Sequence, residues 1–484
     1  MLAVRLAIIL IGAWAVGPIL AKRLSVGEPR PGRLRGWIIF IAIITWVVLF
    51  SVGMLRHLTF HSKAFDLAIF DQVIWNLANG YGWECSVRGM HDLRGDHFEP
   101  ILLLFVPIYK VLPSVAWLLG IQAAALIGAG LILRATYRER IGEIPSFILF
   151  GAFCLYAPVH WLSLADFHPI AIAPLFIAIA WFGSRKNNLY YFLIGLIGLA
   201  ACGEEGLIVG GWWGAWEFLS RRPWRQTGNE NPGTNRIFGW VGCALLPILW
   251  AAFVYLSMIY IPAHRIEGEG YFYVHRYHYL GSSVGEIAKN FVLRPGLWIR
   301  HAFDSRGLAL LALYLVPLAL LPLRRPGTLA LLIPTILYTL LSVADDQRSI
   351  FHQYTAVWIP FLFIAAAEGM IVLRTTASWS MDMRMNPKIV QMRLATGLLV
   401  ASILGFLAFS PIFGFSMHPE FLTPEYWAAE AKGVVQSVKP QEAVSAPSAL
   451  CPHLSHRRML LRQPETNWGG EEVVVVLPEF PPSE

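Results

Sequence analysis

Charged residues are scarce in this chain. Asp, Glu, Lys and Arg make up 14% of its 484 residues, whereas a soluble domain carries roughly 25%. Hydrophobic residues make up 56%, and the mean hydropathy is +0.54. Because a membrane crossing takes about 20 apolar residues, the apolar runs provide about a dozen crossings. No stretch between them is long enough for a large soluble domain, so the composition predicts an α-helical polytopic membrane protein.

Cysteine motifs and a basic face are also missing. The five cysteines form no C-x-x-C pair and no zinc-like spacing, so we predict neither a structural disulfide nor a zinc knuckle. The net charge of +7 comes from Lys and Arg in short clusters between apolar runs. A nucleic-acid binder would carry them on one face. The expected partner is therefore the lipid bilayer and not nucleic acid.

Twelve apolar runs alternate with short basic loops. The runs are 2–21, 37–55, 115–133, 146–163, 170–184, 189–202, 206–219, 237–261, 308–323, 327–343, 354–372 and 394–412. Short basic loops mark the cytoplasmic side, which places the chain's beginning and its tail outside. The first run also has the length of a signal peptide, but its positive charges, Lys22 and Arg23, follow it. That order favours a retained helix.

The chain divides near residue 412. Residues 1–412 hold the predicted crossings and a long first outer loop, 56–114. Residues 413–484 form a predicted small extracytoplasmic α/β domain, with a helix at 424–438 and strands at 443–446, 457–462 and 472–478. Segment 98–112 is apolar but too short to span, which indicates a re-entrant or interfacial helix.

Ionisable residues gather in the predicted outer loops. Such groups near the bilayer surface are costly unless they are paired or hydrated, so several on one face predict a polar cavity. The acidic and histidine candidates are Asp66, Asp71, Asp96, His97, Glu99, Asp166, His168, Glu204 and Glu205. The candidates for binding an anionic group, with an aromatic neighbour, are Arg276, Arg348, His352 and Tyr354.

Plainer interpretations exist for each of these residues. Asp66 also fits the cap of an amphipathic surface helix predicted over 65–75, and a lone histidine more often caps a helix or lies at the headgroup level. Carboxylates with imidazoles can also bind a divalent cation, although no compact ligand spacing indicates one. The cofactor therefore stays unknown, with a divalent cation as the open candidate.

Several short sequence words carry a family resemblance. They are FDLAIFDQ (65–72), GDHFEPIL (95–102), DFHP (166–169), YLGSS (279–283), HQY (352–354) and PHLSHRR (452–458). Together they resemble a family of bacterial and archaeal predicted membrane proteins of uncharacterised function, from about residue 40 to the end. That family is similar to the GT-C glycosyltransferases, such as the protein mannosyltransferases and the aminoarabinose transferases.

The resemblance implies a GT-C-like fold of about twelve transmembrane helices in the prokaryotic cytoplasmic (inner) membrane. Asp66 matches the acidic residue presumed to be the base in GT-C enzymes, and Asp166 matches a second acidic residue that helps to orient the site. Members of the family often carry Lys-Glu-Asp where this chain has Gly203-Glu204-Glu205. Any phosphate role of that lysine is therefore lost here or passes to another residue.

Two functions stay open at the level of sequence. The first is a glycosyltransferase that moves a sugar from a polyprenyl-phosphate donor to an extracytoplasmic acceptor with inversion. Asp66 would take the acceptor proton, and Asp166 would position the acceptor or a cation. The leaving-group charge would fall to Arg276, Arg348 or His352.

The second function is a lipid or solute transporter, or a non-catalytic envelope assembly protein. In that protein the same acidic residues would couple ions or form salt bridges between the helices. A transporter should show broken helices and charge near the middle of the membrane. Here the polar residues gather at one face, which favours surface chemistry.

Overall fold

The computed structural model describes residues 1–24, 31–87, 89, 92–223, 232–265, 272–379, 386–463 and 474–475. Most of the predicted strand 472–478, and part of the predicted inside loop 220–236, lie outside these residues. Within them the chain is mainly helical, as predicted. The long helices are α1 (Leu2–Leu24), α2 (Pro31–Leu58), α5 (Val115–Ile141), α11 (Pro232–Tyr255), α18 (Trp358–Trp379) and α19 (Pro387–Phe409).

Every one of the twelve apolar runs contains helix, but the helices differ in length. Six in the described part of the chain are long and apolar enough to cross a membrane. A bent pair, α6 (Glu143–Leu155) with α7 (Ala157–Leu164), has that length and composition only when its two helices are taken together, and they meet at 44°. The shorter helices are α8 (Ala173–Arg185), α9 (Leu189–Ala201), α10 (Glu205–Arg221), α15 (Ser305–Leu315), α16 (Pro326–Leu329) and α17 (Ile333–Leu340). A 13-residue helix such as α9 is about 20 Å long, against about 30 Å of hydrocarbon. Helices therefore lie where they were predicted, and twelve crossings remains a prediction.

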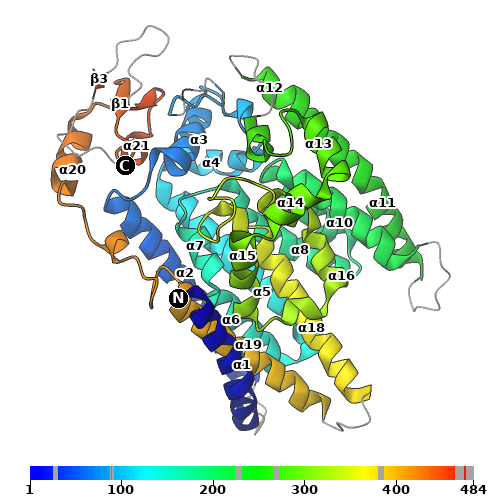
Figure 1. Ribbon diagram of the computed structural model, residues 1–484. Coiled ribbons are helices and arrows are strands. Elements are labelled where there is room, and N and C mark those ends of the chain that lie inside the picture. Colours follow the sequence, from blue (N-terminus) through cyan, green and yellow to red (C-terminus); the bar gives the residue numbers. More distant parts are fainter. Residues whose placement is uncertain are drawn as a thin grey trace.

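Small residues bring neighbouring helices close together. The backbones of α10 and α11 meet at two glycines, where a Cβ on Gly214 would lie 2.6 Å from the Gly242 carbonyl oxygen and one on Gly242 would lie 2.4 Å from that of Gly214. No larger residue fits at either position without separating the helices. In lipid, no hydrophobic driving force holds helices together, so close packing of this kind supplies the attraction between them. α18 is the most buried of the long helices in the described part of the chain and contacts α5, α8 and α19. α1 runs along α19 (Figure 1).

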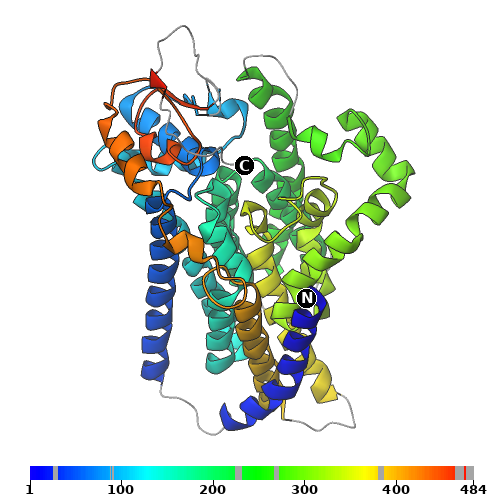
Figure 2. The ribbon, with the colours of Figure 1, turned by 60° about the vertical axis from the view of Figure 1, so that its left-hand side comes forward.

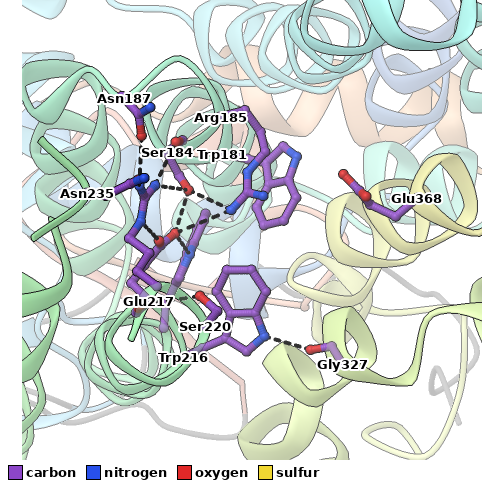
Figure 3. Close-up of polar contacts among 12 residues, drawn as sticks. Trp181, Ser184, Arg185, Asn187, Trp216, Glu217, Ser220, Asn235, Gly327 and Glu368 are labelled. Carbon is purple, nitrogen blue, oxygen red and sulfur yellow. Dashed lines mark hydrogen bonds and ion pairs between the residues drawn. The ribbon is translucent and has the colours of Figure 1, made fainter. Parts of the chain in front are cut away.

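A buried polar cluster ties three helices at the end of α10 that lies away from Glu205. Glu217 has no exposed surface and accepts hydrogen bonds from Ser184 Oγ at 2.5 Å and Arg221 Nε at 2.6 Å. The Arg221 guanidinium also donates to the Asn187 and Asn235 side chains. Figure 3 shows Ser184, Asn187 and Asn235 around Glu217, on α8, the turn after it, and α11. Arg221, one of the basic residues in the loop 220–236 that is predicted to lie inside, is thus also part of the helix packing.

We expect Glu217→Ala to destabilise the bundle strongly. The change leaves Arg221, whose side chain is only 10% exposed, without its buried partner, a loss that typically costs about 3–5 kcal/mol. Thermal unfolding of the detergent-purified protein measures the effect. Glu139→Ala is the matched control, because it breaks an exposed pair with Lys186 and should change the melting temperature little. Equal melting temperatures for the two variants would contradict the structural role of Glu217.

The outer loop and the tail form a separate layer on the bundle. The loop contains α3 (Ile69–Asn79) and α4 (Val106–Tyr109), and the tail contains α20 (Ala428–Ser437) and α21 (Cys451–Leu454). Three short parallel strands complete the tail in the order β2-β1-β3: β1 (Val444–Ala446), β2 (Leu460–Arg462) and β3 (Val474–Val475). The predicted small α/β unit is therefore present, and it lies beside α3 (Figure 1).

A third group of helices stands out from the side of the bundle. After α12 (Ile261–Ala263) come α13 (Val284–Leu293) and α14 (Pro295–Ala302), which appear in light green in Figure 2. α13 has no buried residue. The predicted re-entrant or interfacial segment 98–112 forms a short 3-10 turn and then α4, both too short to cross a bilayer.

Candidate active site and the docked tail

A cavity of about 600 Å³ collects most of the predicted candidates. Ten of the thirteen line it: Asp66, Asp96, His97, Glu99, His168, Glu204, Glu205, Arg276, His352 and Tyr354. They come from the first outer loop, the turns before α8 and α10, and the segments around 276 and 352. The polar cavity predicted from the outer loops therefore exists. Asp71, Asp166 and Arg348 lie elsewhere.

Asp66 and His168 lie side by side at this cavity. His168 Nε2 lies 2.9 Å from Asp66 Oδ1, and the Asp66 side chain is 43% exposed while that of His168 is 8% exposed. Asp66 has a backbone φ of +81°, which is rare for a residue other than glycine and is found most often where function requires it. The strained turn also delays the helix predicted over 65–75, so that α3 begins at Ile69. The Asp66 carboxylate is thus presented to the cavity beside an imidazole.

Asp166 lies directly behind this pair. Its carboxylate forms an ion pair with Arg56 and accepts the backbone N–H of Lys63 at 3.2 Å. Gln122 fixes the same turn, because its amide donates to the Asp166 carbonyl at 2.9 Å and its oxygen accepts the His168 amide at 3.1 Å. Burial raises the pKa of Asp166, and Arg56 opposes that shift. Asp166 therefore holds the chain around Asp66 and His168 in place.

A second group of ionisable side chains lines the cavity around His97. Its ring nitrogens lie 2.9 Å from Glu204 Oε1 and 2.7 Å from the Tyr273 hydroxyl, which also donates to Asp96 at 3.2 Å. Burial opposes a charge on His97, but Tyr273, Glu204 and Asp96 outweigh it and hold the pKa of His97 well above its ordinary value. His97 and Glu204 therefore form a charged pair.

Glu99 differs from its neighbours in this group. It is 9% exposed, and its Oε2 has no hydrogen-bond partner within the described residues. Burial raises the pKa of Glu99 to about 8, against the opposing charge of His97. An unsatisfied buried carboxyl is uncommon in a folded protein and needs an explanation.

Of the two arginines predicted to bind an anionic group, Arg276 lines the cavity. Arg276 donates to Gln347 Oε1 at 2.9 Å, and its guanidinium carbon lies 4.6 Å from the Tyr273 ring centroid and 5.4 Å from that of Tyr354. Arg348 instead is 8% exposed and forms an ion pair with Asp304 at 2.5 Å. It joins the segment before α18 to the start of α15. Burial lowers the pKa of His352, the third residue predicted to hold negative charge.

Asp71 lies in the interface between α3 and the tail. It is fully buried, accepts a hydrogen bond from Tyr109 Oη at 2.6 Å and one from Ser455 Oγ, and lies 3.0 Å from His456 Nε2. Burial alone would raise the pKa of Asp71, but His456, Ser455 and Tyr109 hold it below its ordinary value. Next to it, Gln72 donates to the carbonyls of Arg457 and Arg458 at 3.2 and 3.1 Å. The FDLAIFDQ and PHLSHRR segments, which both carry the family resemblance, thus contact each other.

The rest of the PHLSHRR word packs against the end of α2 and within the tail. His453 stacks on His57 with ring centroids 4.1 Å apart and lies 4.2 Å from the ring of Phe60. Burial lowers the pKa of His453 to about 3. Arg457 is 5% exposed and donates to the carbonyls of Leu454, Lys439 and Glu442. The word is therefore a folding and docking element.

We expect the tail to loosen at alkaline pH. The pKa of Asp71 is lowered from 3.8 and that of His456 is raised from 6.5, so their pair stabilises docking fully between these ordinary values and loses strength as pH rises through the raised pKa of His456. His453 is neutral throughout that rise. Hydrogen exchange of residues 451–462, corrected for the intrinsic rate, should accelerate as pH rises through the raised pKa of His456. Asp71→Asn should remove this pH dependence of the exchange rate. A wild-type exchange rate that does not change with pH would contradict the role of the Asp71–His456 pair.

The geometry assigns no ligands to a divalent cation. Within the described ranges, no three His, Cys, Asp or Glu side chains are arranged to hold a metal ion. Gln122, which fixes the turn that holds Asp166 and His168, was not among the predicted residues. Gln122 carried a signal, because it is a lone amide inside an apolar run.

Apolar helices, a polar cavity and a docked α/β tail define a helical membrane protein. The chain belongs to the family described as "Predicted membrane protein (DUF2079)", which it matches over residues 56–479. This confirms the predicted resemblance to a family of predicted membrane proteins. No curated protein matches the chain.

Two solved structures are similar to the chain as a whole. ArnT from Cupriavidus metallidurans bound to undecaprenyl phosphate is 12% identical with a TM-score of 0.49, over 89% of this chain and 86% of that one. The same protein in the apo state is 12% identical with a TM-score of 0.44, over 88% and 86%. Neither likeness is high enough to assign an activity.

Proposed function

We propose that this protein is a membrane glycosyltransferase that moves a sugar from a polyprenyl-phosphate donor to an extracytoplasmic acceptor, with Asp66 as the base. The observation that carries the proposal is the Asp66–His168 pair, held on a strained turn at the cavity. A base must reach the proton that it removes, and a partly exposed carboxylate beside an imidazole meets that requirement. The position of Asp66, which matches the presumed base of the GT-C enzymes that the family resembles, points to the same residue.

The transfer would proceed as a single displacement. The acceptor hydroxyl oxygen attacks the anomeric carbon while the bond from that carbon to the phosphate oxygen breaks on the opposite face, which inverts the configuration. The proton of the acceptor passes to the Asp66 carboxylate, and the polyprenyl phosphate leaves with the bonding electrons. His168 orients Asp66, and Asp166 with Gln122 positions both residues.

Arg276 is the residue best placed to hold the phosphate. It lines the cavity, lies over two tyrosine rings and is fixed by Gln347. A guanidinium forms paired hydrogen bonds with phosphate oxygens and stays charged at every working pH. His352 adds a neutral N–H donor, while Arg348 is occupied by Asp304. A lipid-linked donor fits because nucleotide sugars stay in the cytoplasm.

Asp66→Asn should leave the protein folded and inserted, because the change keeps the size of the side chain and removes its basicity. Transfer from a polyprenyl-phosphate sugar should fall by about 10² or more, the usual scale for loss of a general base. Single-turnover transfer in proteoliposomes measures the loss. Glu286→Gln, an exposed carboxyl change on α13, is the control and should keep full activity. Full transfer by Asp66→Asn would sink the assignment, and donor binding without any transfer by the wild type would favour the transport or assembly role.

The proposal also requires the cavity and the tail to face away from the cytoplasm. We expect an alkaline phosphatase fusion after residue 484 to be active and a fluorescent protein inserted in the 220–236 loop to fluoresce, because short basic loops stay inside. A cytoplasmic tail would put the cavity on the side of nucleotide sugars and contradict the use of a lipid donor.

A further inference from the structure

Two consecutive backbone N–H groups just before Asp66 are bound by different parts of the molecule. The Lys63 N–H donates to the Asp166 carboxylate in the bundle at 3.2 Å, and the Ala64 N–H donates to Ser448 Oγ in the tail at 3.1 Å. Ser448 lies in the connection between β1 and α21, and α21 also contacts the turn that holds Asp66. The strained turn therefore has one support in the bundle and a second in the tail.

The tail also holds the residue next to Asp66. Phe65 lines the cavity, and the guanidinium carbon of Arg462, at the end of β2, lies 4.2 Å from the centroid of its ring. A cation within about 6 Å of a ring centroid is attracted to the face of the ring. Phe65 is extended, with a φ of −67° and a ψ of 136°, and the backbone reverses directly after it to a φ of +81° at Asp66. Holding the Phe65 ring therefore limits how the backbone can rotate before Asp66.

These two tail contacts belong to a firmly docked unit. Asp71 accepts a hydrogen bond from Ser455 in the interface. The Leu460 N–H of β2 donates to Ser86 Oγ at 2.8 Å, and the Ser86 hydroxyl donates to the Leu460 carbonyl at 3.0 Å. A left-handed conformation at a residue such as Asp66 persists only where the surrounding structure over-determines it. The docked tail provides part of that constraint.

We propose that Ser448 and Arg462 are positioning residues for Asp66, so that the docked tail sets the direction of the base. The inference rests on the proposed function, in which Asp66 removes the acceptor proton. Neither side chain is among the described residues that line the cavity. Each acts through the residue that it holds, Ser448 through Ala64 and Arg462 through Phe65. A small displacement of a catalytic group lowers the rate strongly even when substrate binding is intact.

The first test separates rate from binding. The full chain in proteoliposomes is given radiolabelled polyprenyl-phosphate mannose or glucose, with native membranes as the source of acceptor. We expect Ser448→Ala to lower kcat by about tenfold and to leave the KM for the donor within about twofold, because it removes one hydrogen bond that holds the base and no contact with the donor. Ser448→Thr keeps a hydroxyl and should recover most of the rate. Ser437→Ala, at an exposed hydroxyl of the same tail, is the matched control and should change neither constant.

The second test needs no activity. Hydrogen exchange of residues 63–68 in the full chain reports whether the turn is held. Exchange there should accelerate in Ser448→Ala, while exchange of residues 451–462 and the melting temperature stay unchanged because the tail remains docked. Arg462→Ala should loosen the same turn, and Arg462→Lys, which keeps a cation over Phe65, should restore it. Arg462→Ala takes the place of Ser448→Ala if the latter does not fold.

Three outcomes overturn the proposal. The first is an unchanged kcat with unchanged exchange of residues 63–68 in both Ser448→Ala and Arg462→Ala. The second is a raised KM with an unchanged kcat, which would make the two side chains substrate contacts. The third is a loss of rate that follows the melting temperature and is not rescued by Ser448→Thr or Arg462→Lys, which would make the tail a stabilising cover.

A double variant distinguishes this proposal from the proposed function. Added to Asp66→Asn, Ser448→Ala should lower the rate no further, because it acts through the group that is already lost, and a further loss would overturn the positioning role. A silent Ser448→Ala beside an inactive Asp66→Asn keeps the proposed function and loses the positioning role. A wild type that transfers neither sugar loses the proposed function, and exchange of residues 63–68 alone then upholds or overturns the hold of the tail on the turn.

Discussion

The ion pair between Arg56 and Asp166 is the contact on which the candidate site depends. It joins the end of α2 to the turn before α8, and Asp166 also accepts the Lys63 amide that leads into the strained turn at Asp66. Both partners are largely buried, so removing either would leave a charge that water does not reach. The free-energy cost of breaking this buried ion pair keeps Asp66 and His168 at a fixed distance from each other. An unfavourable φ at Asp66 persists because this pair and Gln122 determine the backbone on both sides.

The buried polar groups at the two ends of the bundle differ in how fully their hydrogen bonds are satisfied. At one end of α10, Glu217 is surrounded by Ser184, Trp213 and Arg221, and Arg221 also donates to Asn235 on α11, so the hydrogen bonds bind three helices together. At the other end, Glu205 faces a cavity and Glu99 keeps an orphaned oxygen. Satisfied buried networks give rigidity, whereas unsatisfied ones are expected where a ligand completes them. This difference supports the proposed site at the end of α10 that carries Glu205, without reference to any relative.

Sequence patterns predicted the helices well because apolar runs leave little choice in lipid, where backbone groups must bond within a helix. They also predicted most of the cavity, since ionisable residues cannot lie near the bilayer singly. The sequence patterns could not show which of these residues line the cavity and which lie in the interface between α3 and the tail. Asp71 and Asp66 lie five residues apart in one word, yet the turn at Asp66 and the start of α3 send them to different environments. Arg348 had no sequence pattern that distinguished it from Arg276. Its ion pair with Asp304 at 2.5 Å and its hydrogen bond to the His301 carbonyl at 2.9 Å do so in the structure.

An experimental structure with a polyprenyl-phosphate sugar bound tests the central claim most directly. The account predicts the phosphate at Arg276 and the anomeric carbon on the Asp66 side of the cavity, with room for an acceptor oxygen about 3 to 3.5 Å from that carbon and within hydrogen-bond reach of the carboxylate. Phosphate bound away from Arg276, or a sugar that leaves Asp66 without access to any acceptor, would contradict it.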